Sequence, residues 1–150
     1  MNKRCVLVVI LITCFSAGAY ARSQKVPTGY GNIQGAKYIR NYDGDTITDN
    51  IPGYPPIIGE NISIRMNGID TPEIKGKCAR EKALAKKARQ QVRSLLVHAR
   101  NIELRNIQRG KYFRIVADVW IDGLSINQIL IREKLAVPYD GGRKTFLWCE

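Results

Sequence analysis

Charged and hydroxyl side chains are concentrated in the short segment 64–73, at the point where an apolar run ends. The run carries one arginine, Arg65, and the turn after it presents Asp70, Thr71 and Glu73. Two carboxylates, a cation and a hydroxyl are costly to bury together unless they form hydrogen bonds or ion pairs with one another or with a ligand. Because catalytic groups commonly lie on short loops held by a rigid scaffold, we interpret this turn as part of a candidate active site.

Two further segments carry groups of the same kinds, residues 43–46 (Asp-Gly-Asp-Thr) and residues 109–114 (Arg-Gly-Lys-Tyr-Phe-Arg). Together the three segments contain what the cleavage of a phosphodiester requires. Hard divalent cations take oxygen ligands, a free carboxylate can take a proton from water, and the planar guanidinium binds phosphate through two hydrogen bonds. The side chains that supply these groups are Asp45, Asp70, Glu73, Arg65 and Arg114.

Each segment also has a purely structural interpretation. Residues 43–45 could form a plain hairpin turn, and Thr71 with Glu73 could cap the start of a helix. Arg114 could be an ordinary strand residue that faces solvent. The joint occurrence of the three segments at strand ends in one short basic chain favours the functional interpretation.

The elements that must position these residues are several short strands and two helices. A helix is predicted over residues 78–100, where apolar residues recur on one face at spacings of three and four. A shorter helix is predicted after Ser125, which suits an N-cap. Strands are predicted at residues 37–42, 45–48, 61–69, 102–107 and 112–121, and a proline-containing loop at 49–59. This order predicts an α+β fold with a small, strongly curved antiparallel sheet or five-stranded OB-type β-barrel and two to three packed helices.

Residues 1–21 have the pattern of a secretory signal peptide. Lys3 and Arg4 precede an apolar run, and residues 19–21 (Ala-Tyr-Ala) fit the small-x-small cleavage pattern. Lipoprotein processing at Cys14 is the alternative. We therefore expect an exported protein that is periplasmic or secreted.

The chain is strongly basic, with 24 basic residues, 13 acidic residues and a formal net charge of +11. A field of this sign favours a polyanionic partner such as nucleic acid, although solubility alone would also explain it. We expect residues 22–36 to form a flexible arm and residues 37–150 to form the folded domain. The mature protein is expected to be a monomer without stable membrane association.

Cys78 and Cys149 are the two cysteines outside the predicted signal peptide. An even pair in an exported protein indicates a disulfide, which would join the tail to the middle of the chain. Two free thiols are the alternative.

The three segments resemble the thermonuclease (staphylococcal-nuclease-like) family. The resemblance extends from about Lys37 to Tyr139 and includes the Asp-Gly-Asp-Thr turn, the Gly-Ile-Asp-Thr-Pro-Glu segment, the Lys-Tyr-x-Arg motif and the following Ala-Asp-Val-Trp-Ile-Asp-Gly. It implies an exported bacterial member of the family with an OB-type barrel and packed helices. It also implies a calcium-dependent phosphodiesterase that cuts DNA and RNA and leaves 3′-phosphate products.

The resemblance also implies roles for the acidic segments. Asp45 and Asp70 would bind calcium through their carboxylates, and Thr71 would bind it through its main-chain carbonyl. Glu73 would orient or deprotonate the attacking water.

Substrate contacts follow from the same resemblance. Arg65 and Arg114 would bind the scissile phosphate and stabilise the transition state. Lys111 and Tyr112 would contact a neighbouring phosphate, and Tyr139 would stack or hydrogen-bond near the nucleotide.

The chain departs from the family pattern at Phe113, where a glycine is common, and in lacking a predicted third, C-terminal helix. The alternative function is a non-catalytic OB-fold module that binds nucleic acid through a basic groove and exposed tyrosines. Such a module would be expected to have lost Glu73 or one arginine, and all of them are present. Docking on anionic membranes or glycans would explain the charge but not the carboxylates.

Overall fold

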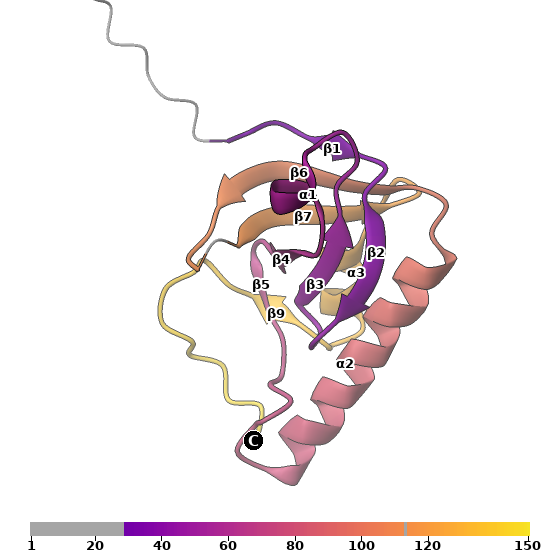
Figure 1. The fold of residues 1–150 in the computed structure, drawn as a ribbon. Coiled ribbons are helices and arrows are strands. Elements are labelled where there is room, and N and C mark those ends of the chain that lie inside the picture. Colours follow the sequence, from indigo (N-terminus) through magenta and orange to yellow (C-terminus); the bar gives the residue numbers. More distant parts are fainter. Residues whose placement is uncertain (1–28, 113) are drawn as a thin grey trace, which may run out of the picture.

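A computed structural model describes residues 29–112 and 114–150 of the chain (Figure 1). The predicted signal peptide, the first part of the predicted arm and Phe113 lie outside the described residues. The strands are β1 (Ile33–Gln34), β2 (Lys37–Asn41), β3 (Thr46–Asn50), β4 (Ile62–Met66), β5 (Ile69–Asp70), β6 (Ile102–Arg109), β7 (Ile115–Ile121), β8 (Leu124–Ser125) and β9 (Val137–Pro138), and the helices are α1 (Pro56–Gly59), α2 (Ala79–His98) and α3 (Ile126–Arg132).

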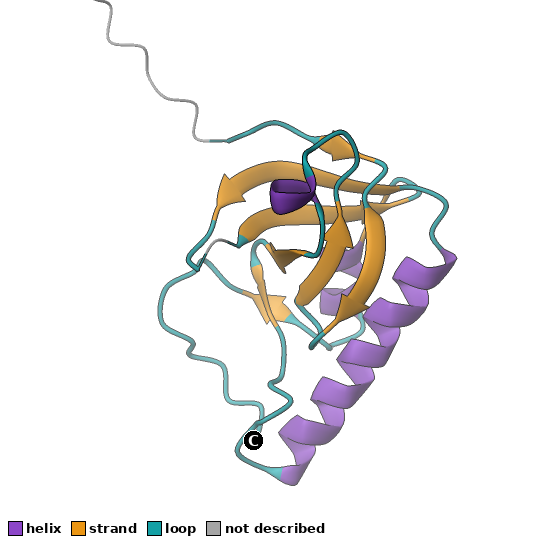
Figure 2. Cartoon of the chain, viewed as in Figure 1, coloured by secondary structure: helices purple, strands orange, loops and turns teal. Residues whose placement is uncertain are grey.

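One curled sheet forms a half-barrel with helices packed beside it, and the predicted α+β, OB-like fold is confirmed (Figure 2). The strand order is β1-β6-β7-β4-β3-β2, and β8 pairs with β7. The five strands of five or more residues are β2, β3, β4, β6 and β7. A second, two-stranded sheet pairs β5 with β9.

The prediction of an antiparallel sheet is wrong at one pair, because β4 and β7 run parallel. Between these strands the chain passes through α2 and β6 before it returns. A parallel neighbour needs such a long crossover, whereas the antiparallel pairs need only turns. The parallel pair places the end of β4 beside the start of β7, where two of the three predicted site segments lie.

Helix α2 agrees with the predicted helix within two residues at each end. Cys78 is its N-cap and accepts a hydrogen bond from the N–H of Glu81. Ala88 and Val92 are fully buried on the face that meets the sheet, where the core includes Ile47 and Ile64. The basic residues of α2 remain exposed, as an amphipathic helix on a core requires.

Two short elements differ from the predictions. The predicted loop at 49–59 contains helix α1, which begins with Pro56, a residue that suits the first helical turn. Within the predicted arm at 22–36, Ile33–Gln34 pairs with β6 as strand β1. The sheet therefore begins at Ile33, because the open edge of β6 offers backbone partners that local sequence does not reveal.

One acidic residue lies inside the core. Asp49 of β3 is fully buried, and neither carboxylate oxygen has a hydrogen-bond partner within the described residues. Burial raises the pKa of Asp49 to about 7.

The tail after β9 runs back along the molecule to the start of α2 (Figure 1). Cys149 forms a disulfide with Cys78, with Cα atoms 6.0 Å apart. Among the helices of the described ranges, none has the length and apolar character that crossing a membrane would need.

Candidate active site

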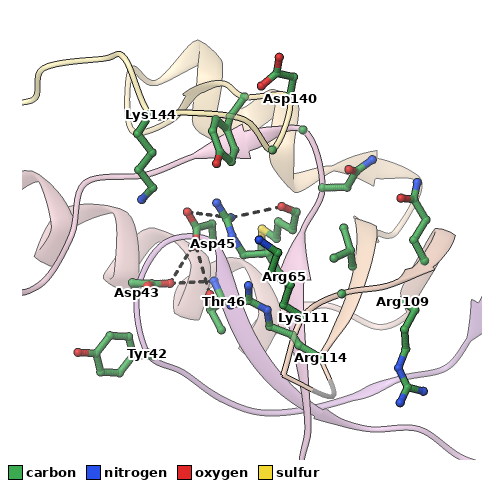
Figure 3. A pocket seen from close by; sticks show the side chains of 18 of the residues that line it. Tyr42, Asp43, Asp45, Thr46, Arg65, Arg109, Lys111, Arg114, Asp140 and Lys144 are labelled. Atoms are coloured by element: carbon green, nitrogen blue, oxygen red, sulfur yellow. Dashed lines mark hydrogen bonds and ion pairs between the residues drawn. The ribbon is translucent and has the colours of Figure 1, made fainter.

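The three segments singled out in the sequence border one cavity of about 840 Å³ (Figure 3). Its walls come from the β2–β3 turn, the end of β4, the β6–β7 turn and the tail after β9. The residues in its lining include Asp45, Arg65, Glu73, Lys111, Arg114, Tyr139 and Lys144. The structure thus brings residues from all three segments to one place and adds a lysine from a fourth.

Arg65 contacts both predicted metal-binding carboxylates, Asp45 in the β2–β3 turn and Asp70 in β5. It lies on β4 opposite Thr46 of β3, and this register sets its position. Its Nη1 lies 2.8 Å from Asp45 Oδ2, and its Nη2 donates to the carbonyl oxygen of Ile69 at 2.9 Å. Nη2 also lies 3.7 Å from Asp70 Oδ1. A planar fork is needed to make these contacts at once.

The carboxylate of Asp45 is buried and closely surrounded. Its Oδ2 accepts hydrogen bonds from the main-chain N–H and the hydroxyl of Thr71 at 3.0 and 2.9 Å. Burial raises the pKa of Asp45 to about 6 against the opposing effect of Arg65, and the charge of Asp43 adds to the rise. A cation bound at this carboxylate would therefore relieve an existing electrostatic cost.

The β2–β3 turn packs against α2 with no room for a larger residue. Asp43 closes the turn, because its Oδ1 accepts from the N–H groups two and three residues ahead at 3.1 and 2.8 Å. A Cβ on Gly44 would lie 2.8 Å from the Cβ of Ala88 and 2.9 Å from the Cγ2 of Thr71. The glycine in this motif is thus required by the close approach of Ala88 and Thr71.

Asp70 and Glu73 share one cation, Lys144 of the tail. The Nζ of Lys144 lies 2.7 Å from Asp70 Oδ1 and donates to Glu73 Oε1 at 2.5 Å. The contact with Asp70 is an ion pair without hydrogen-bond geometry, so this buried oxygen has no hydrogen bond within the described ranges. Burial opposes the charge of Lys144, but the two carboxylates outweigh it and raise the pKa of the ammonium.

The β6–β7 turn supplies positive charge to the cavity. Lys111 and Arg114 line it (Figure 3), and the buried Nε of Arg114 has no hydrogen-bond partner in the described part of the chain. Tyr112 is 93 % exposed and is not in the lining. Tyr139 is in the lining, and its hydroxyl donates to the carbonyl oxygen of Gly142 at 2.6 Å.

Two groups near the site were missed by the sequence analysis, Lys144 and Glu81. The buried carboxylate of Glu81 accepts from the N–H of Lys77 at 2.8 Å and from the N–H of Glu73 at 3.4 Å. Glu81 therefore holds the loop that carries Glu73. Its position three residues after Cys78 is the spacing of a capping box, and this signal could have found it. No comparable signal marked Lys144.

The side chains suit a hard cation such as calcium. Asp45 and Asp70 offer carboxylate oxygens close to Thr71, and Asp70 keeps a buried oxygen without a hydrogen bond. The ammonium of Lys144 already lies between Asp70 and Glu73, which shows that this place attracts positive charge. Oxygen ligands of this kind are the ones calcium prefers. In contrast, the cluster of Cys78, Glu81 and Cys149 offers no such set, because its sulfurs are bonded to each other.

A family model described as "Staphylococcal nuclease homologue" matches residues 63–146, which is more than half of the 150-residue chain. The match contains five of the six predicted catalytic and metal-binding residues, namely Arg65, Asp70, Thr71, Glu73 and Arg114. Asp45 precedes the match and is tied to it through Arg65. A search of curated proteins found no match to this chain.

Proposed function

On the premise that the chain belongs to the staphylococcal nuclease homologue family, we propose that it is an exported, calcium-dependent nuclease. It hydrolyses phosphodiester bonds of DNA and RNA and leaves 3′-phosphate products. Membership of the family supports the reaction class and the nucleic-acid substrate. Calcium dependence, export and the products are our proposal for this chain.

The observation that carries the proposal is the meeting of carboxylates and guanidinium groups at one open cavity. Asp45 and Glu73 lie in the same lining as Arg65 and Arg114. If these charges served only to stabilise the fold, one carboxylate and one guanidinium group in an ion pair would be sufficient. The additional arginine, which has no ion pair among the described residues, suits a phosphate that arrives with the substrate.

Asp45, Asp70 and the main-chain carbonyl of Thr71 would hold the calcium ion. When bound, calcium supplies positive charge that favours attack on a negatively charged phosphate. The half-exposed carboxylate of Glu73 lies at the cavity, where it orients a water molecule or takes its proton.

Arg65 and Arg114 bind the scissile phosphate and stabilise the charge of the five-coordinate transition state. The water oxygen forms a bond to phosphorus, and its proton passes to Glu73. The bond from phosphorus to the 5′ oxygen breaks, and the leaving 5′ oxygen takes a proton from solvent water to become a hydroxyl. The phosphate therefore remains on the 3′ side.

The rest of the substrate has contacts beyond the reacting phosphate. Lys111 binds a neighbouring phosphate, and Tyr139 lies where a nucleotide would enter the cavity. Tyr112 follows Lys111 in the chain, and its exposed side chain is free to contact the neighbouring phosphate or to stack on a base. The full chain has a net charge of +11, of which Lys3 and Arg4 of the predicted signal peptide contribute two, and the remaining positive charge attracts the polyanion over a longer range.

Export is supported by the predicted signal peptide and by the Cys78–Cys149 disulfide. Disulfides persist mainly in oxidising compartments. We therefore place the mature enzyme in the periplasm or outside the cell.

The test is cleavage of single-stranded DNA and of RNA by the oxidised, exported protein, first with calcium and then with excess chelator. We expect cleavage that stops with chelator and products that carry a phosphate at the 3′ end. Product ends are identified by whether a 3′-phosphatase makes them extendable by a polymerase.

The competing function is a nucleic-acid-binding module without chemistry. Tight, salt-sensitive binding of DNA with no cleavage in any divalent cation would establish that function and overturn ours. Cleavage that persists without calcium would support the nuclease activity but would show that calcium is not its cofactor.

A further inference from the structure

Lys144 connects the tail to the carboxylates at which the proposed nuclease binds its metal. We propose that Lys144 is a tethered competitor of the divalent cation. In the metal-free protein its ammonium forms ion pairs with Asp70 and Glu73. This ammonium must be displaced before the divalent cation can bind. This inference rests on the proposed calcium site.

The ammonium of Lys144 occupies the space between the two carboxylates. It lies 2.7 Å from an oxygen of Asp70 and 2.5 Å from an oxygen of Glu73. Figure 3 shows the side chain of Lys144 extending from the tail toward the centre of the site. A divalent cation that takes oxygens from Asp70 cannot share that space with an ammonium at ion-pair distance.

Asp70 is a buried carboxylate that needs a cation in the metal-free protein. Its side chain is 5 % exposed, and its Oδ1 lies 2.7 Å from the ammonium of Lys144. A buried carboxylate without a partner is strongly unfavourable, so the metal-free protein gains from an internal cation. Arg65 is 3.7 Å away and is occupied by Asp45, which leaves Lys144 as the closer charge.

The tail that carries Lys144 is held on both sides of this residue. Before Lys144, Val137 pairs with Asp70 in the two-stranded sheet, and the N–H of Tyr139 donates to the carbonyl oxygen of Gly68. After it, Cys149 is bonded to Cys78 at the start of α2. Two anchors that flank Lys144 keep its ammonium near the carboxylates at a high effective concentration.

The competition has a direct thermodynamic consequence. Any free energy that Lys144 contributes to the metal-free state is lost when calcium binds, so Lys144 lowers the apparent calcium affinity. Loosening the tail at Cys149 lowers the effective concentration of the ammonium. Calcium affinity should then rise, but only while Lys144 is present.

The test measures binding of calcium alone by isothermal titration calorimetry, with the oxidised protein purified after export. We expect Lys144→Gln to bind calcium about tenfold more tightly than the wild type. Arg143→Gln is the matched control, because it removes the same charge from the neighbouring residue, which does not line the cavity. We expect that control to change the affinity by about twofold or less.

A second pair of variants tests the tether. Cys78→Ser/Cys149→Ser removes the disulfide while serine retains an N-cap for α2. It should raise calcium affinity in the wild-type background and leave it unchanged in the Lys144→Gln background. An equal change in both backgrounds would show that the disulfide does not act through Lys144.

The outcomes separate this inference from the proposed function. If Lys144→Gln and Arg143→Gln bind calcium equally tightly, Lys144 is not a competitor, although the calcium site stands. If no variant binds calcium, both the proposed cofactor and this inference are wrong. Thermal unfolding of each variant shows whether its fold is retained.

Discussion

Arg65 Nη1 lies 2.8 Å from Asp45 Oδ2, although Arg65 belongs to strand β4, Asp45 belongs to the β2–β3 turn, and the two residues have different predicted roles. The family resemblance implies that Arg65 binds the phosphate and that Asp45 binds the metal. In the folded chain they contact each other, because Thr46 and Arg65 are opposite each other in the β3–β4 pair. The phosphate-binding and metal-binding parts of the candidate site therefore share one ion pair, and a change in either residue should affect both functions.

Arg65→Lys should lower kcat/KM for DNA cleavage by about 100-fold or more. A lysine cannot contact Asp45, the carbonyl oxygen of Ile69 and a phosphate at the same time. Steady-state kinetics with single-stranded DNA checks this. Arg105→Lys is the control, since Arg105 pairs with Glu103 and is absent from the cavity lining. Wild-type kinetics in Arg65→Lys would show that Arg65 does not take part in catalysis.

Glu73→Gln should lower the cleavage rate by about two to four orders of magnitude, because the amide cannot accept a proton from water. Binding of DNA should remain close to that of the wild type, since the cations of the cavity are unchanged. Single-turnover cleavage and fluorescence anisotropy separate these effects. Glu60→Gln changes an exposed glutamate outside the cavity and should have neither effect. Full activity in Glu73→Gln would disprove the role proposed for this carboxylate.

Gly44→Ala should destabilise the fold by about 1–3 kcal/mol, because its methyl group would overlap Ala88 and Thr71. It should also weaken calcium binding, since Thr71 holds the carboxylate of Asp45. Urea unfolding measures the first effect. Gly29→Ala is the control, because the nearest atom to its new Cβ would be 3.5 Å away. Equal stability of the two variants would contradict the close approach.

Asp49→Asn should make the protein more stable above about pH 7 by up to about 4 kcal/mol. Burial raises the pKa of Asp49 from 3.8 to about 7, so the folded protein retains a proton that the unfolded chain releases. Stability therefore falls as pH rises from about 4 to about 7, and the variant removes this loss. Below about pH 4 the variant and the wild type should be equally stable.

Urea unfolding at about pH 4, 6 and 8 checks the Asp49 prediction. Asp140→Asn is a suitable control, because Asp140 is exposed. The same pH dependence in Asp49→Asn and in the wild type would show that the buried carboxyl does not titrate as proposed.

Local patterns in the sequence were sufficient to predict the helices α2 and α3. Helix α2 follows from apolar residues at helical spacing, and α3 follows from the N-cap at Ser125. Both signals act within one or two turns, so they survive without tertiary context. The two-residue strand β1 has no such pattern, because it is defined by its partner in β6.

The candidate site was partly predictable for a related reason. Residues 43–46 and 64–73 carry unusual groups within short segments, so their chemistry is visible in the sequence. Glu81 was visible only as a capping-box spacing, and its contact with the loop before α2 emerged from the structure. Lys144 is one of many lysines and arginines in the chain, and nothing adjacent to it distinguishes it.

Residue types and local spacing determined the chemistry available to this protein, namely oxygen ligands for a cation and guanidinium groups for phosphate. The tertiary structure decided which of these charged side chains form ion pairs with one another. The strand pairing put Arg65 on Asp45, and the tail, anchored at β9 and Cys149, put Lys144 between Asp70 and Glu73. Such contacts join residues that are 20 to 74 positions apart, and their energy depends on burial and distance, which exist only once the chain has folded.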